Sequence, residues 1–264
     1  MKKRVVVISD LHCGHEYGLT PPDWWYNPQT EHSHILKMAA FQRELWKFYT
    51  ETLDQLKPIY ALIVNGDCIE GKGERSGGTE LNKADRYEQV DMAAQCIQYA
   101  NAKKVRILYG TRSHVGKEED WELILKDKLK SKEVKVEGHA FFEVNGCNFD
   151  VKHKVNSSTV PHGRMTALAR ARLWSQIWNA EQERQPKAHV LIRSHVHYHN
   201  FCGGPDWIAM TTPALTYNST YGVRECEGMV DVGYVYFDVE DDGAFRWDLV
   251  RADFSALRVK SDTL

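Results

Sequence analysis

Aspartate and histidine residues follow several apolar segments of this chain, and their side chains are suited to binding metal ions. Six of them form a candidate ligand set: Asp10, His12, Asp67, His153, His195 and His197. Each comes at or just after a run typical of a β-strand, such as VVVIS at 5–9 or HVLIRS at 189–194. Because α/β folds build active sites at the carboxyl ends of strands, we expect these side chains to share one edge of a sheet.

The spacing of the candidate ligands favours more than one metal ion. Asp10 and His12 are two residues apart, as are His195 and His197. In an extended backbone this spacing points both side chains of a pair the same way. Gly66 precedes Asp67 and is expected to let the backbone approach a ligand closely. Six ligands are too many for one ion with an open position, and they suit two ions that share a carboxylate.

In their order along the chain, these motifs resemble those of the calcineurin-like metallophosphoesterase family. The matching segments are Asp10-Leu11-His12, Gly66-Asp67, Gly110 to His114, His153, and Ser194-His195-Val196-His197. The resemblance implies an α/β fold, a four-layer α/β/β/α sandwich in which two mixed sheets pack face to face with helices outside. It also implies a dinuclear centre. One ion would take Asp10, His12, Asp67 and His197, and the second would take the shared Asp67 with His153 and His195.

The segment from Gly110 to His114 departs from the family's usual Gly-Asn-His, because the Asn is missing and two residues are inserted. Thr111 could bind metal through its hydroxyl or its carbonyl oxygen, or it could contact a residue that binds metal. Alternatively, water could replace the Asn, or His114 could itself reach a metal. We expect His114 to act as a general acid or to stabilise the transition state. The variant looks like that of phage- and prophage-encoded members, which would place the protein in a bacterium or a phage-infected cell.

The resemblance implies a phosphoesterase, and the pattern of ligands implies how it would work. Two divalent ions would lower the pKa of a bridging water, and the resulting hydroxide would attack phosphorus in line. We predict a phosphodiesterase that acts on DNA as a nuclease. The mixture of His nitrogen and carboxylate oxygen suits Mn, Fe or Zn, and the resemblance favours Mn²⁺. The alternative is a phosphomonoesterase acting on nucleotides or phosphoproteins. A non-catalytic scaffold is disfavoured because the chain keeps six candidate ligands.

Basic and aromatic side chains are candidates for contacting the substrate. Arg112 and Arg164 are predicted to bind phosphate, because the guanidinium group matches two phosphate oxygens at once. The group Trp24-Trp25-Tyr26 could stack on bases, but packing of its loop is the favoured interpretation. Cys13 and Cys68 are expected to pack as small hydrophobic side chains, and His15 is expected in a solvated loop.

Composition limits the class of protein. A length of 264 residues with 42% hydrophobic residues supports one domain over residues 1–264 with a substantial core. The net charge of −2 gives no overall bias toward nucleic acid or a membrane. The apolar run after the basic start is too short for a signal peptide, and no stretch approaches the roughly 18 apolar residues of a membrane helix. Six scattered cysteines without a CxxC pair indicate a cytoplasmic protein. The oligomeric state stays open.

Hydrophobic periodicity and turn residues predict the elements that position these groups. Strands are expected over 3–9, 59–65, 104–110, 134–137, 139–145, 147–153, 188–194, 206–211, 230–239 and 244–251. Helices are expected over 34–56, 80–102, 118–131 and 165–183. Strands and helices alternate in the first half and hairpins are commoner in the second, which favours two packed sheets with helices outside.

Overall fold

Two mixed β-sheets carry the elements that end in the candidate ligands. The computed structural model describes residues 1–27, 33–115, 120–130, 133–158, 160–182, 185–218 and 229–254. The first sheet has the order β11-β10-β1-β2-β3-β4, with β1 (Lys3–Ile8), β2 (Ala61–Asn65), β3 (Lys104–Leu108), β4 (Val134–Glu137), β10 (Gly233–Val239) and β11 (Phe245–Arg251). The second has the order β5-β6-β7-β9-β8, with β5 (Ala140–Val144), β6 (Cys147–Lys154), β7 (Val190–Ser194), β8 (Asn200–Gly204) and β9 (Trp207–Thr211).

Each sheet has a parallel centre, which brings strand ends to a common edge. Strands β1 to β4 are parallel neighbours, and β10 and β11 continue the sheet in antiparallel fashion. In the second sheet β6, β7 and β9 are parallel, with antiparallel β5 and β8 at the two sides. The loops after β1, β2, β3 and β7 therefore leave from the edges where their carboxyl ends lie.

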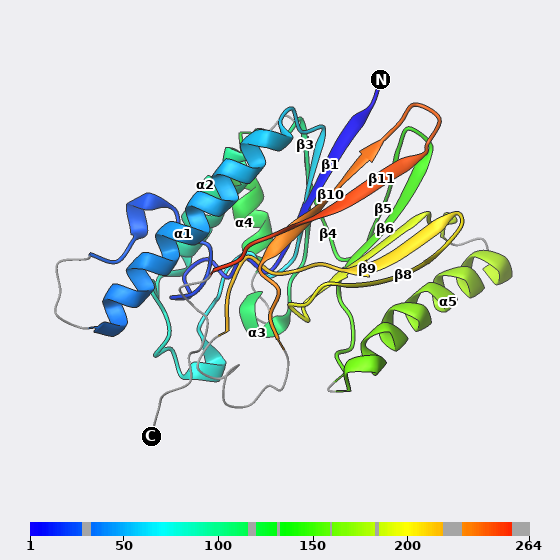
Figure 1. The fold of residues 1–264 in the computed structure, drawn as a ribbon. Helices are drawn as coiled ribbons and strands as arrows, with labels where there is room; N and C mark the ends of the chain where they lie inside the picture. The colour runs from blue at the N-terminus through cyan, green and yellow to red at the C-terminus, as the bar shows by residue number, and fades with distance from the viewer. Residues whose placement is uncertain are drawn as a thin grey trace.

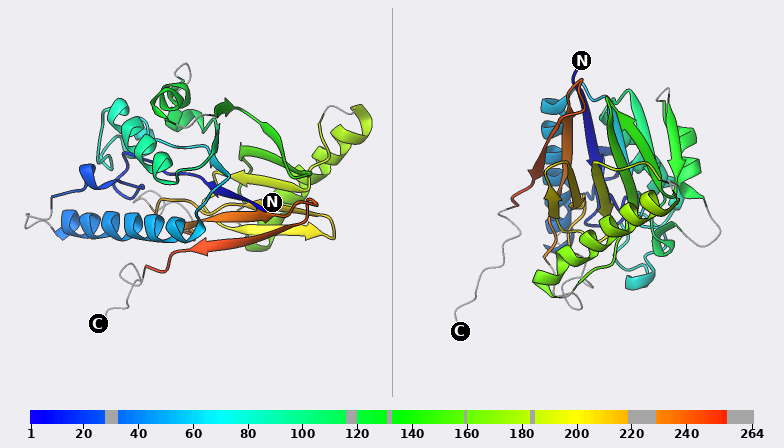
Figure 2. Two further views of the ribbon diagram at one scale, coloured as in Figure 1. Left: turned by 90° about the horizontal axis from the view of Figure 1, so that it is seen from above. Right: turned by 90° about the vertical axis from the view of Figure 1, so that its right-hand side faces the viewer.

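Helices cover the outer faces of both sheets, so the described part of the chain forms four layers (Figures 1 and 2). Helices α1 (Ser33–Leu56), α2 (Arg86–Tyr99) and α4 (Trp121–Lys128) lie on the first sheet. Helix α5 (Arg164–Gln182) lies on the second, where Leu168 packs against Leu191 and Ala209. The expected α/β/β/α sandwich is confirmed.

Strand β1 shows how the sequence produces this arrangement. Val6 and Ile8 face the helix layer, where they pack with residues such as Leu45 of α1. Val5 and Val7 face the second sheet, where they join the core that contains Phe149. Successive side chains of a strand point to opposite faces, so a strand buried on both faces is a continuous apolar run. The VVVI run of β1 is such a strand, and its four side chains are fully buried.

Several expected boundaries are wrong. Helix α2 begins at Arg86 rather than at residue 80, because the Asp85 carboxylate caps it by accepting a hydrogen bond from Tyr87 N (2.7 Å). The expected helix over 118–131 is only Trp121–Lys128 within the described residues, and residues 118, 119 and 131 lie outside them. Strand β8 was not expected, nor was the short helix α3 (Arg112–Val115) inside the Gly110 to His114 segment.

No helix among the described residues is both long and apolar enough to cross a membrane. The single domain over residues 1–264 stays a prediction.

Candidate metal centre

The loops after β1 and β2 run side by side and bring the first three candidate ligands together. Asp10 N donates a hydrogen bond to Gly66 O, and His12 N donates one to Asp67 O, both at 3.1 Å. The loop after β7 joins them where His195 N donates to Asp10 Oδ2 at 3.3 Å. These bonds attach the ends of three strands from two sheets to one another. All six candidate ligands therefore meet at one end of the sandwich.

Five of the six candidate ligands have a backbone that side-chain-bearing residues seldom adopt. Their φ angles are positive: Asp10 51°, His12 45°, Asp67 47°, His195 75° and His197 55°. In the described chain the only other non-glycine residues with positive φ are two asparagines, a residue type that tolerates this region. Strained backbone of this kind gathers at functional sites. The expectation that the two-residue spacing works through an extended backbone is therefore wrong, because tight turns aim these side chains.

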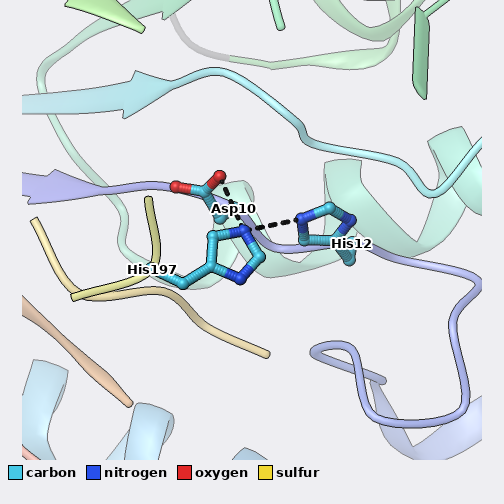
Figure 3. A group of neighbouring side chains, drawn as sticks. All are labelled: Asp10, His12 and His197. Carbon is cyan, nitrogen blue, oxygen red and sulfur yellow. Dashed lines mark hydrogen bonds and ion pairs between the residues drawn. The ribbon is translucent and has the colours of Figure 1, made fainter. Parts of the chain in front are cut away.

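A first group of donor atoms comes from Asp10, His12 and His197, whose ligand atoms lie within 4.8 Å of one another (Figure 3). His197 Nε2 is 3.2 Å from Asp10 Oδ1 and 3.3 Å from His12 Nε2. The Glu70 carboxylate lies 2.7 Å from His12 Nδ1, and because a carboxylate only accepts, Nδ1 carries a proton. The lone pair of His12 is then on Nε2, facing His197. This arrangement of a carboxylate behind an imidazole is typical of metal-binding histidines.

A second group comes from Asp67, His153 and His195, again within 4.8 Å. His153 Nε2 lies 3.0 Å from Asp67 Oδ2, and His195 Nδ1 lies 3.9 Å from the same oxygen. His153 Nδ1 donates to the carbonyl oxygen of Asn65 at 2.5 Å, which fixes the ring so that Nε2 faces Asp67. The basic neighbours Lys152 and Lys154 are exposed, while His153 itself is buried.

His114 brings a third group of donors together with His12 and Asp67. It lies on α3, and its Nδ1 donates to Glu70 O at 2.9 Å while its Nε2 is 4.0 Å from Asp67 Oδ2. The rings of His12 and His114 meet edge to face with centroids 4.5 Å apart. The geometry therefore places His114 beside the candidate ligands, where it can either bind an ion or act on a substrate.

Thr111 contacts the carboxylate of Asp67 directly. Its backbone N donates to Asp67 Oδ1 at 2.6 Å, and its hydroxyl lies 3.2 Å from both carboxylate oxygens. Of the two roles expected for Thr111, contact with a ligand residue is thus the one with observed hydrogen bonds. These bonds orient Asp67 toward the histidines.

Two glycines make room for the candidate ligands. A Cβ on Gly110 would lie 2.2 Å from Asp67 Oδ1 and 2.6 Å from Asp67 N. A Cβ on Gly66, which has φ +83°, would lie 2.3 Å from the ring nitrogen Nδ1 of His153. Gly66 therefore makes space for a ligand side chain, which differs from the expected approach of its backbone to a ligand.

The charged side chains of the centre change one another's pKa values. Burial opposes ionisation of Asp10, but His197 outweighs it and lowers the pKa of Asp10 to about 2. Burial likewise opposes the protonated form of His153, but the Asp67 carboxylate outweighs it and raises the pKa of His153 to about 9. For His12, burial and then His114 lower the pKa. The site thus holds buried negative oxygens that need positive partners.

The donor set fits divalent metal ions. Asp10 Oδ1 is buried and accepts no hydrogen bond, and its near neighbour is His197 Nε2 at ion-pair distance. The nitrogens His12 Nε2 and His197 Nε2 face each other, and oxygen with imidazole nitrogen is a donor mixture suited to Mn, Fe or Zn. The described residues therefore form candidate divalent-metal-binding clusters.

Two residues that were not predicted from the sequence contact the candidate ligands and orient their rings. Glu70 contacts both His12 and His114, and Asn65 accepts from His153 and donates to Ser194 Oγ at 2.6 Å. Glu70 lies three residues after Asp67 in the same loop, which is the one sequence signal that could have found it. A lone carboxylate in a loop is usually solvated, so the signal is weak.

The two arginines expected to bind substrate differ in their surroundings. Arg112 is exposed on α3, between Thr111 and His114. Arg164 begins α5, and its guanidinium lies over the ring of Tyr198, 4.2 Å from the centroid. Tyr198 directly follows His197, so this stacking ties the start of α5 to the candidate centre. Their binding of substrate stays a prediction.

Other residues near the motifs pack against the body of the protein. His15 is only 6% exposed and lies near Glu80, so the expected solvated loop is wrong at this residue. Cys13 and Cys68 are buried, and burial raises the pKa of both thiols well above the usual value, in agreement with a packing role. Trp25 donates to Thr20 O, which attaches its loop to the protein as expected.

Solved structures are similar to this chain at low sequence identity. No protein-family model matches the chain, and no curated protein matches it. A predicted phosphoesterase from Streptococcus pneumoniae TIGR4 is 12% identical, over 94% of this chain and 89% of that chain, with a TM-score of 0.41. Vps29 from Entamoeba histolytica, complexed with zinc, is 13% identical over 94% and 98%, with a TM-score of 0.46. An archaeal phosphodiesterase is 13% identical over 93% and 99%, with a TM-score of 0.44.

At this identity and these TM-scores, the likeness does not extend to activity or ligands. The fold assignment rests on this chain's own strand order and layers, which define an α/β/β/α sandwich with candidate metal-binding clusters at one end.

Glu122 of α4 provides a test of the electrostatics beside Asp67. Its Oε1 accepts from Gly110 N at 3.0 Å, its Oε2 is buried without a hydrogen-bond partner, and burial raises its pKa to about 7. Between pH 4.5 and about 7, Glu122 of the folded chain therefore keeps a proton that the unfolded chain has lost. The free energy of unfolding falls as pH rises through that window.

Glu122→Gln keeps an acceptor for Gly110 N but cannot ionise. In metal-free protein we expect the variant to be on the order of 2–3 kcal/mol more stable at about pH 8, with little difference at about pH 5. Urea unfolding at both pH values measures this, and an equal difference at both would contradict it.

Gly110→Ala tests whether the space beside Asp67 matters for metal binding. The added methyl group must displace the Asp67 carboxylate, so we expect the affinity for Mn²⁺ or Zn²⁺ to fall at least about 10- to 100-fold. Titration calorimetry measures the affinity, and far-ultraviolet circular dichroism checks that the variant is folded. Gly138→Ala is the matched control, because a Cβ there has nothing within 4 Å. Wild-type affinity in Gly110→Ala would show that Asp67 has no part in binding.

Proposed function

We propose that this protein is a metal-dependent phosphoesterase that hydrolyses phosphodiester bonds, with DNA as its substrate class. The observation that carries the proposal is the position of Asp67, which belongs to two overlapping groups of donor atoms, one with His12 and His114 and one with His153 and His195. A buried carboxylate shared between two groups suits a pair of ions. The resemblance of the ordered motifs to calcineurin-like metallophosphoesterases supports the same reading.

The group of Asp10, His12 and His197 and the group of Asp67, His153 and His195 support a division of the residues between two ions. One ion would be held by Asp10, His12, Asp67 and His197. The other would be held by Asp67, His153 and His195. When bound, divalent ions supply a nucleophile near neutral pH and neutralise charge on the phosphoryl oxygens. The resemblance favours Mn²⁺, with Fe or Zn as alternatives.

The surrounding side chains would bind and orient the substrate. His114 Nδ1 donates to Glu70 O, so Nε2 is the atom that would give a proton to the leaving oxygen. Arg112 is exposed beside it on α3 and would contact a phosphate oxygen. Arg164, held against Tyr198, would contact phosphate on the side of α5. Thr111 keeps the Asp67 carboxylate oriented throughout.

The preference for a diester over a monoester rests on the sequence. The Gly110 to His114 segment looks like that of phage- and prophage-type members, and the alternative is a phosphomonoesterase of nucleotides or phosphoproteins. A cytoplasmic location belongs to the same proposal. It is supported by the free thiols of the described cysteines, four of which are buried.

The activity is tested with a diester and a monoester of the same alcohol. With added Mn²⁺ we expect faster hydrolysis of bis-p-nitrophenyl phosphate than of p-nitrophenyl phosphate, and cleavage of plasmid DNA. Asp67→Asn should lower turnover by more than about 100-fold, since loss of a shared ligand should exceed the effect of a residue behind a ligand. Asp127→Asn on the exposed face of α4 is the control and should behave as wild type. Monoester preference with intact plasmid would favour the alternative, and unchanged activity in Asp67→Asn would refute the dinuclear centre.

His114→Ala distinguishes a catalytic group from a metal ligand. We expect turnover to fall about 10²- to 10⁴-fold, because proton transfer by a positioned side chain is lost, while the metal content per chain stays unchanged. Elemental analysis of the dialysed protein measures the metal, and the pH profile of turnover should lose one limb. Loss of one ion per chain would instead make His114 a ligand. His189→Ala is the control, since His189 directly precedes β7, at the end of that strand opposite His195.

A further inference from the structure

Helix α5 presents an apolar stripe on the side that faces away from the protein. Large hydrophobic residues along it are exposed: Leu173 56%, Trp174 56%, Ile177 38% and Trp178 38%. Residues three or four apart are neighbours on the surface of a helix, so these four side chains form one connected stripe. The opposite side carries Leu168, which is fully buried against the second sheet. Figure 2 (right) shows α5 across the front of the molecule, with its outer side toward the viewer.

This stripe is unusual within the described chain. Of the twelve large hydrophobic residues that are exposed there, five lie on α5: the four above and Met165. Scattered exposed hydrophobic residues need no explanation, but a contiguous group of this kind marks an interaction surface. Tryptophan in particular is enriched at the centres of protein interfaces. The stripe therefore needs a partner surface.

A charged residue lies at each end of the stripe, and the two charges indicate which kind of surface would bind there. Arg170 precedes it and Glu181 follows it, and both are exposed. They are eleven residues apart, about three helical turns, so they lie on the same side of α5. The α5 face, defined as Arg170, Leu173, Trp174, Ile177, Trp178 and Glu181, is thus apolar in the middle with opposite charges at its ends. After a rotation of 180° that makes two copies of α5 antiparallel, such a face is complementary to itself.

We propose that a second copy of this chain packs on the α5 face, with the two α5 helices antiparallel about a two-fold axis. An axis between residues 175 and 176 sets Arg170 of one protomer opposite Glu181 of its partner, and this pairing occurs twice. The same axis sets Leu173 opposite Trp178 and Trp174 opposite Ile177. A two-fold interface uses one patch on both subunits, which requires this self-complementarity.

The composition of the α5 face disfavours other occupants. Nucleic acid would need several positive charges to meet phosphates, whereas this face carries one arginine and one glutamate. A helix that lies on an anionic membrane is rich in exposed Lys and Arg on its polar side. Of the three arginines of α5, Arg172 is buried and Arg164 lies over the ring of Tyr198, which leaves Arg170 on the α5 face. A single helix face offers less than the roughly 800 Å² per partner of a standard interface. We therefore expect a dimer in the micromolar range of dissociation constant.

Charge reversal tests the pairing in the full-length protein. Sedimentation equilibrium should show wild type passing from monomer to dimer as its concentration rises. Arg170→Glu and Glu181→Arg should each weaken the dimer roughly tenfold or more, because each sets two like charges opposite one another. The double variant R170E/E181R should restore wild-type association. Restoration is specific to antiparallel self-pairing, because a foreign partner would not carry the compensating change.

The apolar part of the face is tested separately. Leu173→Ser combined with Ile177→Ser should give a monomer, whereas Leu123→Ser, which removes an exposed leucine of α4, should leave the dimer intact. Chelation of metals should not alter the dimer, which separates this proposal from the metal centre. A wild-type chain that stays monomeric at several hundred micromolar would overturn the proposal. So would a dimer that survives the double serine change, or one that R170E/E181R fails to restore.

Discussion

The buried carboxylate of Asp67 is the constraint on which the site depends. It lies at the end of β2, without exposure to solvent, and its negative charge must be met inside the protein. Thr111, in the loop after β3, donates a hydrogen bond to one carboxylate oxygen, and His153, from the second sheet, contacts the other. Gly110 is needed because any side chain there would occupy the place of the carboxylate. The loop after β3, the ring of His153 and the turn at Gly66 are therefore all arranged around one charged group.

The backbone around this carboxylate carries a cost that the rest of the fold offsets. Left-handed φ at five candidate ligands costs of order 1–3 kcal/mol for each residue. The hydrogen bonds between the loops after β1 and β2, and the contact of Leu215 N with Asp10 O, hold these turns in place. The ends of the strands before them are buried on both faces, and a close-packed interior of this kind has low compressibility. The result is a site whose geometry is set before any ion binds.

Much of the fold could be predicted from the sequence, because β1, β2 and β7 are apolar runs with one interpretation. The segment of β8, NFCGG, could not, since two glycines weaken strand propensity and the strand exists through its pairing with β9. The start of α2 was placed too early, because the residues just before α2 adjoin a helix in the sequence but pair with the loop after β1. Leu81 forms a β-bridge with His15, and Asn82 N donates to Gly14 O. The six candidate ligands lie together in the described structure, and their binding of metal stays a prediction. Their left-handed turns were not foreseen, because no local residue preference encodes them, and Glu70 and Glu122 have sequence surroundings typical of solvated carboxylates.

The candidate ligands come from both sheets, and this has a consequence for the apolar layer between them. Asp10, His12 and Asp67 follow strands of the first sheet, whereas His153, His195 and His197 belong to the second. The layer between the sheets, which contains Phe149 and Phe237 with their rings edge to face, sets the spacing of the strands from which these two sets of side chains reach one another. The packing of this hydrophobic layer therefore affects how closely the candidate ligands of the two sheets approach one another. Substitutions that change the volume of this layer can then alter the candidate site without touching any of its residues.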